Sequence, residues 1–521
     1  MKLADLRINR NTLFLSAASG ILLFLSFPKF GSWITAWVAL VSLFFALRDV
    51  TLWQGLIAGF TAGLVFNIGI MYWITFVVVH YGHLPYSVGV LLMLFVAAYL
   101  AIYVALFAGG VVYFRGRGIP AVVAAPVLWT CLEYAKSQLL TGFPWENLSY
   151  SQYLNRFLIQ VVDITGPYGI SFIVVLINVV LFNALVAKGR GRRTIVQVAL
   201  AIVTLACVYT YGYIRVNQID RAVRTAEAAH VTLVQGNIDQ SIKWNPEFQA
   251  GTVDVYRKLS LENRASGPGL TVWPETAAPF FFQDASGMRD EVEGVARASG
   301  EWLLFGSPSY SKNCDGDNSC VSFLNSAYLL SPQARISGRY DKVHLVPFGE
   351  YVPLRRFFPF VNKLVVGVGD FGRGNGYHPV DMNGHKLGVL ICYEGIFPEA
   401  SRAYRNEGAD LLVNITNDAW FGKSSAPYQH LSMTVFRAVE DRAYLVRSAN
   451  TGISAIVDPT GRITAQTELF ERTALSGTVR FMEGGTFYAT HGDTFVAACA
   501  LALISSILIS LRRRNAYTCG N

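Results

Sequence analysis

The chain has 521 residues, of which 52% are hydrophobic and 15% are charged, and its formal net charge is +8. Such a length predicts about two to four domains, and the small share of charged residues excludes an ordinary soluble protein. The positive charge is explained by basic residues that flank predicted membrane segments, so it does not indicate a nucleic-acid partner.

Apolar residues are concentrated at the two ends of the chain. Residues 50–114 contain no Asp, Glu, Lys or Arg, whereas one membrane-spanning helix needs about 20 apolar residues. This stretch therefore predicts two spans joined by the polar turn 80–85. Over the whole chain the pattern predicts an α-helical membrane bundle of about eight spans, at 11–28, 31–47, 52–79, 86–114, 119–135, 165–187, 194–214 and 493–511.

The fifth predicted span has the weakest signal, because Glu133 and Lys136 lie at its end. A carboxylate near a membrane boundary can contact a lipid headgroup, or it can pair with the neighbouring lysine. The sequence leaves both roles open.

Basic residues flank the predicted spans on one side. They are Arg7, Arg10, Arg48, Arg115, Arg117, Lys188, Arg190, Arg192, Arg193, Arg512, Arg513 and Arg514. Because cytoplasmic loops are enriched in Lys and Arg, we expect an N-terminal membrane domain of about seven spans at 1–216. Residues 217–488 then form a domain outside the cytoplasm, and 489–521 form a last span with a short cytoplasmic tail.

The middle region alternates short strand-like runs with helical patterns, which is typical of a layered α/β domain. The predicted strands are 230–236, 270–273, 302–307, 326–330, 387–392, 411–415 and 454–457. The predicted helices are 398–407 and 427–444.

Three fragments of the middle region carry candidate catalytic residues. One apolar run ends in the thiol of Cys392, a second ends in the carboxylate of Glu275, and a third fragment holds Lys342. A free thiol has a pKa of about 8.5, so Cys392 needs a base, for which Glu275 is the candidate. Lys342 would stabilise the thiolate and then an oxyanion. Together these residues indicate covalent catalysis, although a lone cysteine is more often a buried structural thiol.

These motifs resemble the Glu-Lys-Cys triad of the nitrilase superfamily. With membrane spans on both sides, the chain is similar to the membrane-embedded branch of that superfamily, the apolipoprotein N-acyltransferases. Further matching strings are Val-Gln-Gly-Asn at 234–237, Pro-Phe-Gly-Glu-Tyr-Val-Pro at 347–353, Asn-Asp-Ala-Trp-Phe-Gly at 417–422 and Gly-Phe-Pro-Trp at 142–145. The resemblance covers almost the full length. It implies an αββα nitrilase-like sandwich on the periplasmic face of a bacterial inner membrane.

The resemblance also implies roles for other residues. Glu350 would support the site, where a solvated loop carboxylate is the alternative, and Tyr393 and Glu394 would line it. The substrate-binding candidates are Trp145, Trp244 and Trp420, of which the last two can also be core aromatics. Neither a metal nor an organic cofactor is implied.

Members of this family take an acyl chain from a phospholipid, chiefly phosphatidylethanolamine. They pass it through a cysteine thioester to the α-amino group of the diacylglyceryl-cysteine that begins an apolipoprotein. The alternative is a membrane-tethered thiol amidase or C–N hydrolase with the same triad and water as acceptor, but about seven spans exceed what a tether needs. A non-catalytic scaffold or transporter is disfavoured by the complete triad and by the few charges within the spans.

Two further cysteines, Cys314 and Cys320, are predicted to lie outside the cytoplasm, where disulfides persist. We expect them to be bonded to each other. Two free surface thiols are the alternative, because a short turn can hold the Cα atoms too far apart.

Overall fold

The computed structural model describes residues 8–187, 191–264, 267–312, 321–352 and 371–518, with side chains to Arg512. Cys314, Cys320 and Pro353 lie outside the described residues. The chain forms two compact units. The helical unit comprises the residues up to Thr75, Pro85–Val216 and the residues from His491 onward, and the α/β unit comprises Phe76–Leu84 and Asn217–Thr490.

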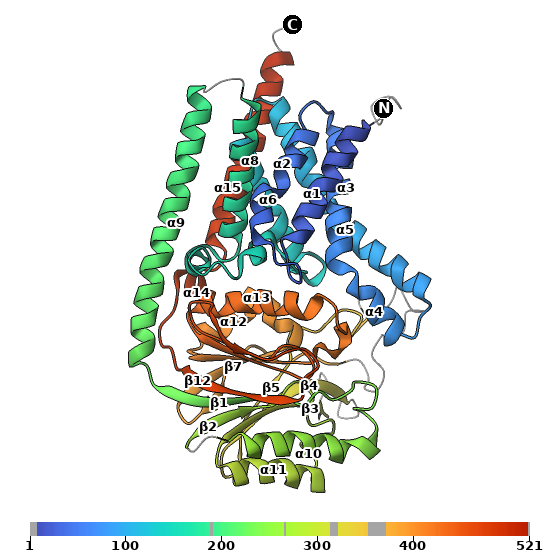
Figure 1. Ribbon diagram of the computed structural model, residues 1–521, viewed down its shortest axis with the longest axis vertical. Helices are drawn as coiled ribbons and strands as arrows, with labels where there is room; N and C mark the ends of the chain where they lie inside the picture. The colour runs from blue at the N-terminus through green and yellow to red at the C-terminus, as the bar shows by residue number, and fades with distance from the viewer. Residues whose placement is uncertain (1–7, 188–190, 265–266, 313–320, 353–370, 519–521) are drawn as a thin grey trace. The chain divides into compact units, whose positions relative to one another are not determined.

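The helical unit contains several long apolar helices (Figure 1). Its elements are α1 (Arg10–Leu25), α2 (Ala36–Ala46), α3 (Leu52–Met71), α5 (Tyr86–Gly116), α6 (Ala121–Gln138), α7 (Val162–Thr165), α8 (Tyr168–Val186), most of α9 (Arg192–Thr225) and α15 (Thr494–Thr518). Among the described residues, α3, α5, α8, α9 and the Thr494–Arg512 part of α15 are long and apolar enough to cross a membrane, and α1 and Trp33–Ala46 are shorter apolar segments. The apolar helices are thus confirmed, whereas the number of eight spans stays a prediction.

Close packing of α3 on α5 follows from glycines repeated every fourth residue on α3. Gly55, Gly59 and Gly63 face α5, and a Cβ atom at Gly59 would lie 2.5 Å from the Cβ atom of Ala108. Small residues at this spacing let two helix backbones approach each other, as is common in membrane helices.

The predicted span 52–79 is wrong in one respect, because the structure breaks it into two helices. Helix α3 ends at Met71, and a separate helix α4 (Trp73–His80) follows Tyr72. The segment Phe76–Leu84 groups with the α/β unit. A run without charged residues does not reveal such a break, since both helices are apolar.

The α/β unit consists of two six-stranded sheets. In the first the order is β12 (Thr473–Arg480), β1 (Ala228–Gln235), β2 (Gly269–Val272), β3 (Trp302–Ser311), β4 (Ser322–Leu330) and β5 (Ile336–Asp341). In the second it is β11 (Ile463–Gln466), β10 (Ala455–Val457), β9 (Tyr444–Ala449), β8 (Leu411–Thr416), β7 (His385–Ile391) and β6 (Val380–Met382). Strands β1, β2 and β3 are mutually parallel, as are β7, β8 and β9.

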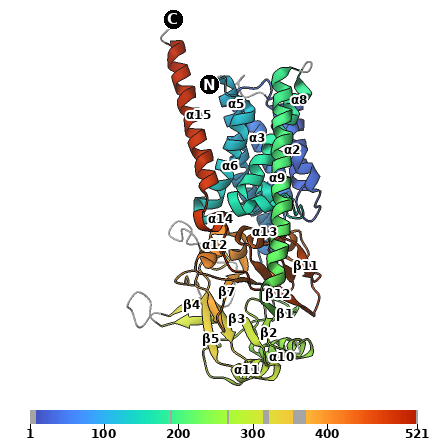
Figure 2. The same cartoon turned by 90° about the vertical axis from the view of Figure 1, so that its left-hand side faces the viewer.

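Helices cover the outer face of each sheet, as two perpendicular views show (Figures 1 and 2). Helices α10 (Pro246–Glu262) and α11 (Gly287–Ser299) lie on the first sheet, and α12 (Pro398–Asn406) and α13 (Ala426–Asp441) lie on the second. The hydroxyl of Ser448 on β9 donates to the carbonyl oxygens of Val234 and Val272, which joins the two sheets directly. The unit is therefore the αββα sandwich that the resemblance implied.

All predicted strands are present, but the predicted helix 427–444 is too long. Helix α13 ends at Asp441, because Arg442 takes a left-handed conformation with φ of 51°, which is a common way to end a helix. Tyr444 then begins strand β9.

Candidate active site

Glu275 lies just after β2, and a buried aromatic cluster fixes the chain before it. Trp273 is fully buried, stacks on Tyr256 with ring centroids 5.2 Å apart, and donates its indole N–H to Ser260 over 2.8 Å. The backbone then passes Gly306 so closely that a Cβ atom there would lie 2.7 Å from the Cα atom of Glu275. The candidate base is thus held by rigid structure on two sides.

The carboxylate of Glu275 is buried, with 7% of the residue exposed, and both of its oxygens accept hydrogen bonds. Oε1 accepts from Asn325 Nδ2 over 2.8 Å, and Oε2 accepts from the backbone N–H of Asn417 over 3.0 Å. The backbone carbonyl of Glu275 accepts from Lys243 Nζ over 3.0 Å. These contacts orient the carboxylate and leave it in place to exchange a proton.

Lys342 follows β5 and lies between two carboxylates. Its Nζ atom is 3.7 Å from Glu275 Oε1 and 2.9 Å from Glu350 Oε2, and the side chain is 1% exposed. Burial alone would lower the pKa of Lys342, but Glu350 and Glu275 outweigh burial and raise that pKa above its ordinary value. Lys342 is therefore held between the two carboxylates in its charged form, and its catalytic role stays a prediction.

Glu350 is part of this cluster and is not a solvated loop carboxylate, since it is 8% exposed. Its Oε1 accepts from Asn325 Nδ2 over 2.9 Å, and its Oε2 accepts from the backbone N–H of Val346 over 2.8 Å. Asn325 thus bridges the two carboxylates that contact Lys342. The sequence analysis missed Asn325 and Lys243, because an amide within a strand and a lysine in a loop carry no motif of their own.

Cys392 begins the turn that follows β7, and it has a backbone φ of 53°. Thr276, which follows Glu275, and Phe348, two residues before Glu350, also have positive φ, at 49° and 62°. Residues other than glycine rarely adopt this conformation, and such strain tends to occur at functional sites. The turn places the thiol at the carboxyl end of a buried parallel strand.

The environment of Cys392 favours the neutral thiol in the resting protein. Burial and the charge of Glu275 raise the pKa of Cys392 well above its ordinary value, although Lys342 acts in the opposite direction. A thiol must lose its proton to become a nucleophile. Cys392 therefore depends on a base at the moment of attack, which is the role open to Glu275.

Behind Cys392 lies a buried polar network that the sequence analysis did not identify. His430 Nε2 is 3.2 Å from the carbonyl oxygen of Cys392, and His430 Nδ1 is 3.0 Å from Asp418 Oδ1. Asp418 also forms an ion pair with Arg447 over 2.7 Å, and Asn414 Nδ2 donates to the Cys392 carbonyl over 3.4 Å. Burial alone would raise the pKa of Asp418, but Arg447 and His430 outweigh it and hold that pKa well below its usual range. The network holds the strained backbone of Cys392.

Tyr393 and Glu394 follow Cys392 and are both buried. Glu394 Oε1 accepts from the Tyr340 hydroxyl and from the N–H groups of Val343 and His344, and its Oε2 accepts from Ile391 N–H. Glu394 thus ties the turn after β7 to the segment that carries Lys342. The ring of Tyr393 packs on Phe397, with centroids 4.9 Å apart.

The three candidate tryptophans fall into both units. Trp244 and Trp420 belong to the α/β unit and are partly buried. Trp244 adjoins Lys243, and Trp420 packs edge-on against Tyr81 with ring centroids 4.7 Å apart. Trp145 belongs to the helical unit, where it is buried against Trp73 with centroids 5.1 Å apart. Their binding of substrate stays a prediction.

Known proteins resemble both parts of the chain. Residues 230–485 match the family described as Carbon-nitrogen hydrolase, and residues 19–180 match the family described as Apolipoprotein N-acyltransferase N-terminal domain. Among solved structures, a mutant amidase from Nesterenkonia sp. AN1 is similar over 52% of this chain and 98% of its own, with 18% identity and a TM-score of 0.36.

Relatives of the whole chain share one name. An apolipoprotein N-acyltransferase of Geobacter metallireducens is 47% identical over 516 residues, which cover 98% of this chain and 97% of the relative. One of Methylococcus capsulatus is 35% identical over 96% of each chain, and one of Pasteurella multocida is 32% identical over 95% of this chain and 94% of its own. The chain belongs to the apolipoprotein N-acyltransferase family.

Proposed function

We propose that the chain transfers a fatty acyl group from a membrane phospholipid to the α-amino group of the diacylglyceryl-cysteine that begins an apolipoprotein, the last step of lipoprotein maturation. Family membership over the full length supports this function. The observation that carries the mechanism is a buried cluster in which Lys342 Nζ lies 3.7 Å from Glu275 Oε1. Both groups also shift the pKa of the Cys392 thiol, Glu275 upward and Lys342 downward.

In the first half-reaction Glu275 takes the thiol proton, and the sulfur attacks the ester carbonyl of the phospholipid. Lys342 stabilises the oxyanion that forms. When the tetrahedral intermediate collapses, the C–O bond breaks and Glu275 returns the proton to the leaving alkoxide. The products are a lysophospholipid and a thioester on Cys392, so the acyl group is conserved for transfer.

In the second half-reaction the neutral α-amine of the acceptor attacks the thioester. Glu275 accepts the ammonium proton of the new tetrahedral intermediate, the C–S bond breaks, and the proton returns to the departing sulfur. An amide and a free thiol result. Glu350 keeps Lys342 in position through both steps, since it contacts Lys342 Nζ over 2.9 Å.

The proposed setting is a bacterial inner membrane, with about eight spans and the α/β unit on the periplasmic side. The one-sided distribution of Arg and Lys supports this orientation, and the apolar helices of the helical unit support a membrane location. Phosphatidylethanolamine is the proposed donor, by likeness to the family. A membrane-tethered hydrolase remains the rival function, and it differs in passing the acyl group to water.

Intact-mass spectrometry tests the proposal on the full-length protein. After incubation with phospholipid, we expect an added acyl mass on the wild type and on the Cys207→Ala control, which removes an exposed cysteine of α9. Cys392→Ala should carry no adduct. A diacylglyceryl-cysteine peptide should then discharge the thioester, and the same peptide with an acetylated amine should not.

Two outcomes contradict the proposal. An adduct on Cys392→Ala would show that another residue is the nucleophile. A thioester that water discharges as fast as the free-amine peptide would favour the hydrolase.

A further inference from the structure

Glu133 in the helical unit is not used by the proposed mechanism, although it is a buried carboxylate among apolar helices. It lies near the end of α6 and is 7% exposed. Its Oε1 accepts from the backbone N–H of Leu148 over 2.6 Å, whereas its Oε2 has no hydrogen-bond partner among the residues that the structure describes. Leaving a buried carboxylate oxygen unpaired is costly, most of all in a membrane.

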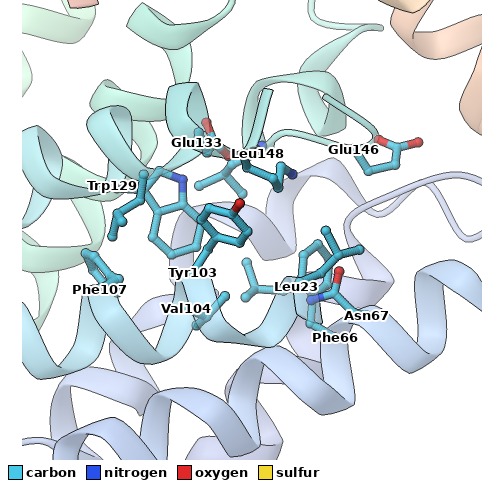
Figure 3. A pocket seen from close by; sticks show the side chains of 13 residues that line it. Leu23, Phe66, Asn67, Tyr103, Val104, Phe107, Trp129, Glu133, Glu146 and Leu148 are labelled. Atoms are coloured by element: carbon cyan, nitrogen blue, oxygen red, sulfur yellow. Dashed lines mark hydrogen bonds between the residues drawn. The ribbon is translucent and has the colours of Figure 1, made fainter. Parts of the chain in front are cut away.

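Glu133 lines a cavity within the helical unit (Figure 3). In Figure 3, Tyr103 and Trp129 lie on one side of this cavity and Leu23, Phe66 and Asn67 on the other. The remaining lining residues are Leu100, Val104, Phe107, Leu132, Lys136, Glu146 and Leu148. The cavity thus has mainly aromatic and aliphatic walls with a few polar groups, as small-molecule sites do.

The charges around the cavity favour a cation. Two carboxylates, Glu133 and Glu146, line it together with one lysine. Lys136 Nζ donates to the carbonyl oxygen of Trp145 over 3.1 Å. Its single positive charge offsets one of the two carboxylates, so a negative charge is left when both are ionised. The rings of Tyr103 and Trp129 supply faces that attract cations.

Helix ends add to this preference. Leu23, Asn67 and Lys136 lie in or next to the last turns of α1, α3 and α6, which end at Leu25, Met71 and Gln138. The C-terminal end of a helix carries partial negative charge and favours a cation nearby. Asn67 also offers an acceptor. Its amide nitrogen donates to the carbonyl oxygen of Gly63, so its amide oxygen is the atom that can accept from a ligand.

The size of the cavity restricts the cation. The cavity volume is about 40 Å³, which leaves room for a small polar group. A primary ammonium group with its adjoining methylene fits this space. A trimethylammonium group is bulkier and has no N–H to donate to Glu133 Oε2.

We infer that this cavity, termed the Glu133 pocket, binds the primary ammonium group of a lipid, with Glu133 Oε2 as its main acceptor. The source of this ammonium group rests on the proposed function, which offers two molecules with the same chemistry. One is the donor, through its ethanolamine headgroup, and the other is the lipidated acceptor, through its α-amino group.

Lipid retention tests the inference without any turnover. Full-length protein with Cys392→Ala is equilibrated in detergent with equal amounts of phosphatidylethanolamine and phosphatidylcholine of identical chains, and the bound lipids are measured by native mass spectrometry. We expect phosphatidylethanolamine to be retained in about tenfold excess, since a hydrogen bond between charged groups gives a preference of this order. Adding Glu133→Gln should reduce the excess to about one while keeping an oxygen for Leu148 N–H.

The matched control is Asp163→Asn in the same background. Asp163 is a buried carboxylate of the helical unit, but it is paired with Arg215 over 3.0 Å and does not line the pocket. Its substitution should leave the lipid preference unchanged. If Glu133→Gln lowers the thermal midpoint, Val104→Met from the opposite wall replaces it, because it fills the cavity and keeps the charge.

A second arm identifies the source of the ammonium group. A diacylglyceryl-cysteine peptide with a free amine competes against the same peptide with an acetylated amine. If the preference for the free amine depends on Glu133, the ammonium group in the pocket comes from the acceptor. If only phosphatidylethanolamine shows a Glu133-dependent preference, the ammonium group comes from the donor. If Glu133→Gln and Val104→Met alter neither preference, the inference is overturned. Failure of the proposed function is a separate result, since it is the absence of a thioester on wild-type Cys392.

Discussion

Methionine matches the length of lysine without its charge, so Lys342→Met would leave Glu275 and Glu350 buried without the cation that now lies within 3.7 Å of both. Removing one partner of a buried ion pair typically costs about 3–5 kcal/mol, because an uncompensated charge stays behind. For a domain of this size, each kcal/mol lowers the thermal midpoint by about 2–4 °C. We therefore expect a decrease of roughly 6–20 °C.

Part of that loss should disappear when Glu350 is also neutralised. In a Glu350→Gln background Lys342→Met leaves one buried carboxylate in place of two, so the two substitutions should couple by about 1–3 kcal/mol. Thermal unfolding of the wild type, both single variants and the double variant in one detergent measures this coupling. Lys258→Met is the control, since Lys258 pairs with Asp254 on the surface and is 60% exposed, where ion pairs contribute little. The reasoning is refuted if Lys342→Met costs no more than Lys258→Met, or if its cost is the same in both backgrounds.

Three further predictions address the base, its neighbour and the topology. Gly306→Ala should slow thioester formation about 100-fold, because the new Cβ atom would lie 2.7 Å from the Cα atom of Glu275 and displacing a catalytic group by about 1 Å has this effect. Gly294→Ala is the control and should keep the wild-type rate, since a Cβ atom there meets open space. Equal rates in the two variants would contradict the close approach at Gly306. Burial lowers the pKa of Lys243 from 10.5 to about 7. Between these pH values the folded chain therefore binds fewer protons than the unfolded chain. The wild type should gain stability relative to Lys243→Met as pH rises from about 7 toward 10.5. The check is the thermal unfolding midpoint of both proteins as a function of pH. A constant difference between the two midpoints over this range would show that Lys243 is charged in the folded protein. A reporter fused after Asn521 should read as cytoplasmic and one inserted at Asp315 as extracytoplasmic, and the opposite reading at either point would mean a miscounted span.

The candidate catalytic fragments could be recognised in the sequence because each joins an abrupt change of polarity to a strand. Glu275 and Cys392 directly follow apolar runs that form β2 and β7, and Lys342 follows β5. Their meeting at one site then follows from the sandwich, which brings the ends of strands from both sheets together. Asn325 could not be found in this way, since it lies inside β4 and its importance comes from bridging Glu275 and Glu350.

The missed elements were hidden for different physical reasons. Strand β12 is mostly half-exposed, so its sequence lacks the apolar run of a buried strand. Strand β9 is buried, but it follows α13 after a short turn at Arg442 and reads as a continuation of the helix. In the helical unit, uniform apolarity hides the break between α3 and α4.

The polar network behind Cys392 makes the placement of this thiol conditional on complete assembly of the second sheet. Its members come from β8, from the turn after it, from α13 and from β9, so no local segment can form it. In a chain whose second sheet is incompletely formed, the Cys392 carbonyl lacks its donors, and the backbone is free to leave its φ of 53°. The backbone geometry of Cys392 is therefore a property of the completed second sheet and its helix, and no shorter segment of the chain can produce it.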